Sequence, residues 1–285
     1  MLLDLALLNR LERLQLATRR RLIGDFSGEH RSIRHGSSLD FADYREYHPG
    51  DDYRRIDYHL YARLDLLLLK LYEADDDLHV RLMVDTSASM GADGKLEQAA
   101  RLAAALGFVA LVRRDTVSLH TFPARNPGQR FAGRHSTNAL FDTLEGLRAG
   151  GETHFVRAAT HTIARPGPAG VSVVISDLLT PEWEDGLRHL PARRGDVVVV
   201  HVLSRSDLWP DLVGDMDLVD SESGARIPVS ANPELLREYV ARAEEWCNDV
   251  ATLCRHMGAG YVQVLADEPI GPRLLAGWQR AGVLR

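Results

Sequence analysis

His79-Val80-Arg81-Leu82-Met83-Val84 runs directly into Asp85-Thr86-Ser87-Ala88-Ser89, and this stretch decides the fold. The first six residues alternate and then become fully apolar, which is typical of a strand buried in a parallel sheet. The strand ends at Asp85, where small polar residues begin. Open α/β sheets bind their ligands in loops at the carboxyl ends of such strands. The Asp-x-Ser-x-Ser run therefore predicts a binding site for a divalent cation.

Two later segments add oxygen ligands to this site. Gly150-Gly151-Glu152-Thr153 predicts a turn that supplies a threonine hydroxyl, and residues 171–177 predict a second buried strand that ends in an aspartate. The two aspartates should therefore emerge side by side at one edge of the sheet. Magnesium prefers near-octahedral oxygen ligands and retains several waters, so we expect Mg²⁺, with Mn²⁺ as the second choice. The expected ligands are Asp85, Ser87, Ser89, Thr153 and Asp177.

In order and spacing, these five residues resemble the metal-ion-dependent adhesion site (MIDAS) of von Willebrand factor A domains. The resemblance implies that Ser87 and Ser89 bind the metal directly. It implies that Asp85, Thr153 and Asp177 bind it directly or through water. It also implies that an acidic side chain of a partner protein fills the open coordination position.

The region before the site resembles a narrower family. Asp43-Tyr44-Arg45-Glu46-Tyr47-His48-Pro49-Gly50-Asp51-Asp52-Tyr53-Arg54-Arg55-Ile56-Asp57-Tyr58 is similar to the signature of the bacterial domain of unknown function fifty-eight. Its members resemble von Willebrand A domains, are often encoded beside MoxR-type AAA+ ATPases, and often carry tryptophan in place of Tyr58. The similarity covers nearly the whole chain. It implies a magnesium-dependent protein-interaction module, an adaptor or co-chaperone of a MoxR-type ATPase, and not an enzyme.

Other interpretations of the five residues stay open at this point. A metal-dependent hydrolase or phosphatase would use the same cation, but both aspartates are accounted for as ligands and no histidine is tied to the site by sequence. A scaffold would hold the metal for structure alone. In a degenerate relic of the fold, serine and aspartate would merely cap the following helix. Paired carboxylates without a compensating charge argue against the relic.

Strand-like and helical segments alternate along the rest of the chain, which predicts an α/β fold of the von Willebrand A type, with an open, mostly parallel sheet and helices on both faces. Strands are expected at residues 66–72, 79–84, 116–122, 171–177, 196–203 and 261–265, and helices at 95–114, 136–147, 154–164, 181–190, 233–257 and 272–281. Residues 215–229 predict a C-terminal hairpin that turns at Ser223-Gly224. We expect this domain to span residues 66–285, after an N-terminal helical and irregular extension over residues 1–65.

The extension contains two features of its own. Leucines at helical spacing predict an amphipathic first helix, which we expect to dock on the body of the protein; lying on a membrane is the alternative. Residues 40–65 interleave tyrosine, arginine and a larger number of acidic residues. We interpret them as arginine–carboxylate pairs that hold the extension in place. The alternative is a partner-binding surface at Tyr53, Arg54 and Arg55.

Composition and charge narrow the class of protein. The chain has 285 residues, 45% of them hydrophobic, and can bury a full core. Its net charge of −6 argues against nucleic acid as a partner. Sparse cysteine, no expected export signal and no expected transmembrane segment indicate a cytoplasmic protein, with peripheral attachment to the inner membrane as the alternative.

Two other motifs are set aside. Gly91-Ala92-Asp93-Gly94-Lys95-Leu96 ends in Gly-Lys but lacks the spacing of a phosphate-binding loop. Asp220-Ser221-Glu222-Ser223-Gly224 resembles the start of a calcium loop, but the glutamate that supplies bidentate ligation is missing. A hairpin turn is the better interpretation of the second motif.

Overall fold

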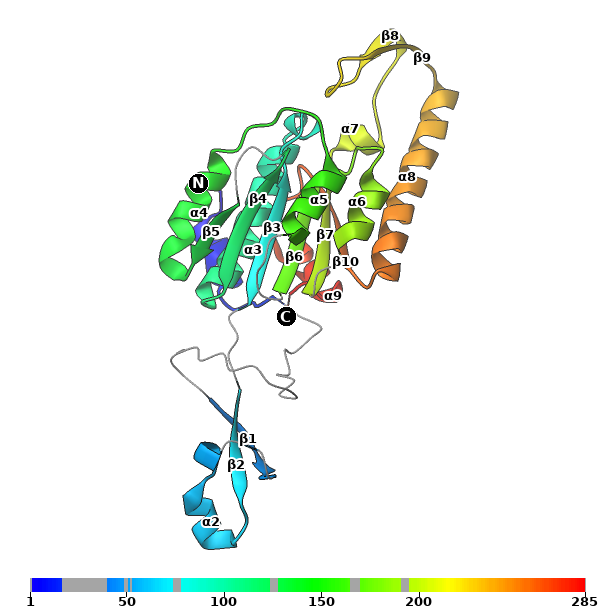
Figure 1. The fold of residues 1–285 in the computed structure, drawn as a ribbon. Coiled ribbons are helices and arrows are strands. Elements are labelled where there is room, and N and C mark those ends of the chain that lie inside the picture. Colours follow the sequence, from blue (N-terminus) through cyan, green and yellow to red (C-terminus); the bar gives the residue numbers. More distant parts are fainter. Residues whose placement is uncertain are drawn as a thin grey trace. The chain divides into compact units, whose positions relative to one another are not determined.

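The computed structural model describes residues 2–16, 40–48, 51, 53–73, 78–123, 128–164, 170–190 and 195–284. They belong to two compact units, one formed by Met1–Arg20 with Leu78–Arg285 and the other by Arg21–Asp77 (Figure 1). This division differs from the expected one, because the first helix joins the large unit and residues 66–77 join the small one.

A six-stranded sheet forms the centre of the large unit. Its strands lie in the order β10 (Gly260–Leu265), β7 (Gly195–Leu203), β6 (Gly170–Ser176), β3 (His79–Asp85), β4 (Thr116–Phe122) and β5 (Gln129–Ala132). Neighbouring strands are parallel except for β4 and β5. The fold is therefore a mixed α/β architecture with a mostly parallel central sheet, as expected from the alternating segments.

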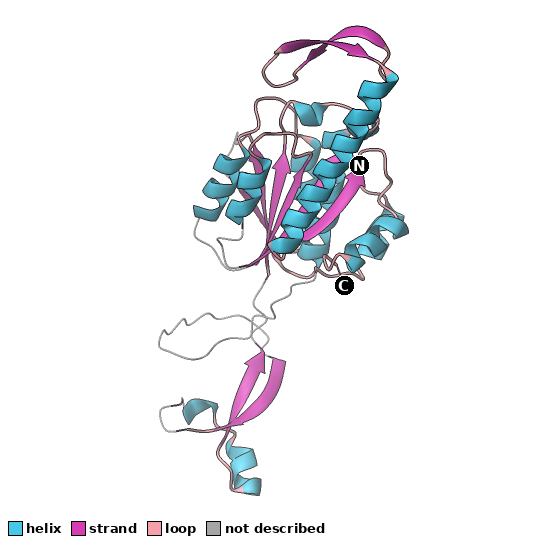
Figure 2. Ribbon diagram, turned by 90° about the vertical axis from the view of Figure 1, so that its right-hand side faces the viewer, coloured by secondary structure: helices cyan, strands magenta, loops and turns pink. Residues whose placement is uncertain are grey.

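Helices cover both faces of this sheet (Figures 1 and 2). One core cluster contains side chains of α1 (Leu5–Leu11), α3 (Lys95–Val112), α4 (Thr137–Glu145) and α9 (Pro272–Arg280). A second cluster contains side chains of α5 (Phe155–Ala164), α6 (Trp183–His189) and α8 (Pro233–His256). Leu82 and Val84 belong to the first cluster and Met83 to the second. This period of two is what a strand buried on both faces requires.

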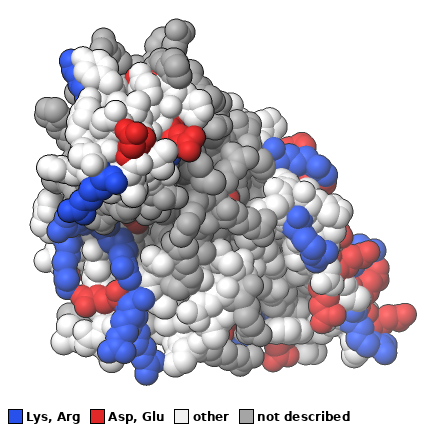
Figure 3. Space-filling view, turned by 90° about the horizontal axis from the view of Figure 1, so that it is seen from below, with Lys and Arg blue, Asp and Glu red and all other residues white. Residues whose placement is uncertain are grey.

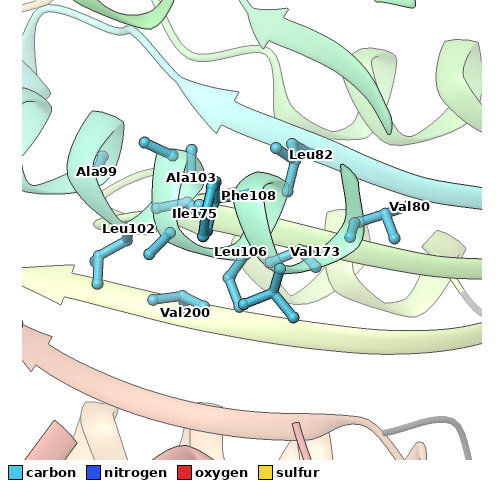
Figure 4. Packing of buried hydrophobic residues seen from close by; sticks show 14 of the residues in the cluster. Val80, Leu82, Ala99, Leu102, Ala103, Leu106, Phe108, Val173, Ile175 and Val200 are labelled. Atoms are coloured by element: carbon cyan, nitrogen blue, oxygen red, sulfur yellow. The ribbon is translucent and has the colours of Figure 1, made fainter. Parts of the chain in front are cut away.

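Helix α3 packs along the middle of the sheet. Its alanines and leucines contact the valines and isoleucine of β3, β6 and β7 (Figure 4). Small alanines let the helix approach the sheet closely, and the leucines fill the space between the strands. The central strands are thereby fixed in position, and so are the loops at their carboxyl ends.

The first helix is part of this core. Leu3, Leu7 and Leu11 are buried in the first cluster, and Asp4 caps the helix by accepting a hydrogen bond of 2.7 Å from the Leu7 amide. The expected docking on the body is confirmed, because the apolar face of the helix is covered by the protein itself. Among the residues that the structure describes, no helix is long and apolar enough to cross a membrane.

The expected hairpin is confirmed as β8 (Gly214–Val219) and β9 (Arg226–Ala231), which pair antiparallel. Asp220 accepts hydrogen bonds from the amide and hydroxyl of Ser223, and Gly224 has a φ of +72°, where a side chain would be strained. The hairpin leads into the N-terminus of α8, and α7 (Arg205–Leu208) precedes it.

The small unit contains β1 (Asp40–Glu46), β2 (Leu68–Glu73) and α2 (Tyr58–Leu64). The strand expected at residues 66–72 does form as β2, but it pairs antiparallel with β1 and is not part of the central sheet. Arg45 pairs with Asp51 at 2.9 Å within this unit. The expectation that arginine–carboxylate pairs hold the extension to the edge of the central sheet stays a prediction. Tyr53 is exposed, whereas the side chain of Arg55 lies outside the described residues.

Candidate metal centre

Two buried aspartates lie at the carboxyl ends of neighbouring strands. Asp85 is the last residue of β3 and Asp177 follows the last residue of β6, and these two strands pair in parallel. The side chains of Asp85 and Asp177 are almost fully buried. The sequence predicted this convergence, and the reason is the expected one: parallel strands that end together place their next residues at one edge of the sheet.

Asp85 is held by neutral hydrogen-bond donors. One carboxylate oxygen accepts from the Ser87 amide at 2.9 Å, and the other accepts from the Ser176 hydroxyl at 2.6 Å. Burial and, after it, the nearby charge of Asp177 together raise the pKa of the Asp85 carboxyl to about 7. An ionised carboxylate at this position therefore lacks a compensating positive charge, which a bound cation would supply.

The two serine hydroxyls of the Asp-x-Ser-x-Ser run lie together. A hydrogen bond of 3.0 Å joins Ser87 Oγ and Ser89 Oγ. Adjacent ligands of an octahedral Mg²⁺ at 2.0–2.1 Å from the metal are about 2.9 Å apart. The spacing of this hydroxyl pair therefore fits two adjacent positions around magnesium. Within the described residues, no group of three or more His, Cys, Asp and Glu side chains is placed to hold a metal ion, so a centre here would rely on hydroxyl oxygens.

The turn that carries Thr153 is joined to this loop by its backbone. The Ala88 amide donates to the Gly151 carbonyl at 3.0 Å, and the Gly150 amide donates to the Thr86 carbonyl at 2.9 Å. Gly151 has a φ of +93°, and a Cβ there would lie 3.0 Å from the Pro123 ring. Glycine is thus required for the turn to approach the loop.

Thr153 makes a contact that the sequence did not predict. Its amide and its hydroxyl both donate to the carboxylate of Glu222, at 2.9 Å and 2.7 Å. Glu222 lies in the turn of the β8–β9 hairpin, 69 residues later in the chain. A hydroxyl that donates its proton keeps two lone pairs, so Thr153 can still bind a cation while it holds Glu222.

A buried lysine is the second unpredicted member of the site. Lys95 Nζ lies 2.8 Å from Asp177 Oδ2 and 3.1 Å from Asp207 Oδ2, and its side chain is fully buried at the start of α3. Burial by itself lowers the pKa of Lys95, but Asp177 and Asp207 outweigh burial and raise it. Asp177 is thus compensated from within the chain. The one sequence signal for this role is that Lys95 is one of two lysines among 34 basic residues.

The nearest histidine is engaged elsewhere. His201 on β7 is fully buried, and its ring nitrogens lie 3.0 Å from the Asp177 carbonyl and 3.0 Å from the Tyr261 hydroxyl. Burial lowers the pKa of His201 to about 4, so the ring is neutral at physiological pH. These hydrogen bonds link β7 to the residue after β6 and to β10. Neither ring nitrogen is directed toward the serine hydroxyls.

The face shown in Figure 3 carries charges of both signs. Basic side chains gather on its left side, and basic and acidic side chains lie together on its right side. The predicted partner-binding residues Tyr53 and Arg54 belong to the small unit, whereas the candidate metal centre belongs to the large unit.

Comparison with known proteins identifies relatives over most of the chain. It is 30% identical over 272 residues to an uncharacterized protein of Mycobacterium tuberculosis, Rv1480, and equally to one of Mycobacterium bovis, Mb1516, covering 90% of this chain and 84% of each relative. Two solved structures are similar over 72% of the chain: a conserved hypothetical protein BatB from Bacteroides thetaiotaomicron, at 15% identity with a TM-score of 0.40, and an aerotolerance-related membrane protein from Bacteroides fragilis, at 16% with 0.41. The match covers 96% of the first of these solved chains and 98% of the second. Residues 43–247 match the model of a family described as Protein of unknown function DUF58, and the chain belongs to this family.

Proposed function

We propose that this protein is a magnesium-dependent protein-interaction module of the von Willebrand A type. In this proposal, Asp85, Ser87 and Ser89 bind the cation together with Thr153 and Asp177, directly or through water. The observation that carries the proposal is the environment of Asp85: its carboxyl group is buried and held by neutral donors, and it lies beside two hydroxyls whose separation suits adjacent ligands of an octahedral cation.

The distribution of charge supports one added cation. Lys95 lies between Asp177 and Asp207, so these two carboxylates share one ammonium. With Asp85 ionised, the group carries three negative charges and one positive charge. A divalent ion would bring the sum to zero, and buried charges are stable only when they are paired in this way.

The same chemistry defines the partner. Hydroxyls and water are neutral ligands, so a cation held mainly by them keeps an affinity for a further anionic oxygen. The class of partner that fits is a protein with an exposed aspartate or glutamate. A MoxR-type AAA+ ATPase, with this protein as its adaptor or co-chaperone, is proposed on the family resemblance, and magnesium is the ion that such ATPases also use.

The proposal favours binding over catalysis. A hydrolase would need a general base within hydrogen-bond reach of the reacting water. His201 is neutral, and its nitrogens hold the Asp177 carbonyl and the Tyr261 hydroxyl. Asp85 and Asp177 are accounted for as ligands, and Glu222 is bound to Thr153.

The test is affinity capture from the source cell, performed with millimolar Mg²⁺ and again with chelator. We expect a partner that is captured by the wild type in Mg²⁺, is lost in chelator, and is lost with Asp85→Asn. Asp217→Asn makes the same chemical change at an exposed position of β8 and should capture normally. A partner bound equally in Mg²⁺ and chelator would contradict metal-dependent binding. Turnover of generic phosphoesters that depends on Asp85 would favour the hydrolase.

A further inference from the structure

The contact between Glu222 and Thr153 joins the hairpin to the candidate metal centre. Both oxygens of the Glu222 carboxylate are used, one by the Thr153 amide and one by its hydroxyl. Thr153 is buried and Glu222 is half-buried. An acidic side chain from a distant part of the chain therefore lies against one of the predicted metal ligands.

Few residues in the rest of the hairpin are buried. Of the residues in β8 and β9, only Ala231 at the far end is buried, and Leu218, Val219 and Ile227 are exposed. Figure 1 shows the two strands beyond the edge of the sheet at which β3 and β6 end. An element with few buried apolar contacts opens at low cost in free energy. The bonds from Thr153 to Glu222 are then an important part of what holds the hairpin in place.

The turn prepares Glu222 for this contact. Asp220 accepts hydrogen bonds from the Ser223 hydroxyl at 2.6 Å and from the amides of Ser223 and Glu222 at 2.6 Å and 3.2 Å. These bonds, the one from the Ser223 hydroxyl first, lower the pKa of Asp220. Because Asp220 fixes the backbone of the turn, Glu222 is presented at its tip with the carboxylate free to reach Thr153. The partners of that carboxylate are neutral N–H and O–H groups. A nearby divalent cation would add a favourable charge interaction to them.

We propose that Glu222 is an internal acidic ligand of the candidate metal centre. It holds the β8–β9 hairpin against Thr153, in the place that an acidic side chain of a partner would take, and the partner displaces it. This inference rests on the proposed function for the identity of the cation, but the attachment of the hairpin stands on the Thr153–Glu222 bonds alone. It also gives the motif at residues 220–224 a role beyond that of a turn.

Hydrogen–deuterium exchange of the amides between residues 214 and 231 tests this inference in the full-length chain. Three proteins are compared, each with Mg²⁺ and with chelator: wild type, Glu222→Gln and Asp217→Asn. Asp217→Asn removes the same charge from the same hairpin at an exposed position. In chelator we expect hairpin exchange to be about tenfold faster in Glu222→Gln than in the other two, because the glutamine amide cannot accept both bonds.

The effect of magnesium separates the inference from the proposed function. We expect Mg²⁺ to slow hairpin exchange further in the wild type and in Asp217→Asn, and to leave it unchanged in Glu222→Gln. Equal exchange in wild type and Glu222→Gln would overturn the attachment. Calorimetric Mg²⁺ binding without slower exchange would overturn the role as a ligand and leave the proposed function intact. Absence of Mg²⁺ binding in all three would overturn the proposed function, and with it the ligand role; exchange in chelator would then still decide the attachment.

Discussion

The two halves of the candidate metal centre differ in how they compensate a buried aspartate. At the end of β6, Asp177 is paired with the ammonium of Lys95 at 2.8 Å. At the end of β3, Asp85 is held by an amide and a hydroxyl, and its pKa rises to about 7 because it is buried and lies near Asp177. The fold therefore supplies a positive charge for Asp177 and only neutral donors for Asp85.

The largest expected effect on stability comes from removing the buried ammonium of Lys95. Lys95→Met leaves the buried Asp177 and the partly buried Asp207 without their shared partner. Breaking a buried pair in this way costs about 3–5 kcal/mol. Chemical denaturation measures it, with Arg101→Met on the same helix as a control that should stay within about 0.5 kcal/mol of wild type. Equal stability of Lys95→Met and wild type would show that the two aspartates do not need Lys95.

The next effect concerns Asp85 in the absence of metal. A carboxyl whose folded pKa is raised loses stability as pH rises from its unfolded value of 3.8 to about 7. Asp85→Asn does not lose this stability, because asparagine does not ionise. In chelator, the stability of Asp85→Asn relative to wild type should therefore increase by roughly 3 kcal/mol between pH 5 and pH 8, at 1.36 kcal/mol per pKa unit.

The difference in free energy of unfolding between wild type and Asp85→Asn is needed, because His201 changes stability with pH in the opposite direction to Asp85. Its pKa is lowered to about 4, so it destabilises the folded state as pH falls below the unfolded value of 6.5. This contribution is common to both proteins and cancels. Denaturation curves of wild type and Asp85→Asn that run parallel across the pH range would show that Asp85 is not a strained carboxylate.

We expect added Mg²⁺ to stabilise the folded protein by binding at Asp85. Binding to the folded state alone stabilises it by about 2.7 kcal/mol at a hundredfold excess over the dissociation constant. Thermal unfolding at pH 7.5 should show this shift in wild type and in Asp217→Asn, and no shift in Asp85→Asn. A shift of the same size in Asp85→Asn would show that magnesium binds at a site that does not include Asp85.

The smallest effect belongs to a third buried aspartate, in the other unit. Asp57 caps α2 by accepting from the His59 and Leu60 amides, and it also accepts from the Tyr44 hydroxyl at 3.0 Å. Tyr44→Phe removes one neutral donor and should cost about 1 kcal/mol. Denaturation followed in both units measures it. A loss as large as that of Lys95→Met would contradict the expectation that one hydroxyl donor contributes less than a buried ammonium.

The sequence was sufficient to predict the sheet and the aspartates at its edge. Apolar runs mark β3 and β6, and parallel strands bring their ends together. Leu66–Leu69 looked like another such run, but β2 pairs with β1 in the small unit, and Leu66 and Leu67 are exposed there. A leucine run alone does not specify which strand it will pair with. The four-residue elements β5 and α7 are too short to give a periodic signal.

The contacts that complete the site could not be predicted in the same way. Lys95 and Asp177 are 82 residues apart, and Thr153 and Glu222 are 69 apart. No local pattern links such pairs, because they meet only when the loops at the edge of the sheet are folded. The scarcity of lysine in an arginine-rich chain was the one indication that Lys95 has a special position.

Isothermal titration of Mg²⁺ into metal-free protein at pH 7.5 tests the central claim most directly, because it measures whether the missing charge at Asp85 is supplied by a cation. We expect one Mg²⁺ per chain for wild type, an unchanged isotherm for Asp217→Asn, and no binding for Asp85→Asn in a protein that remains folded. Absence of binding to wild type, or equal binding to Asp85→Asn, would contradict it.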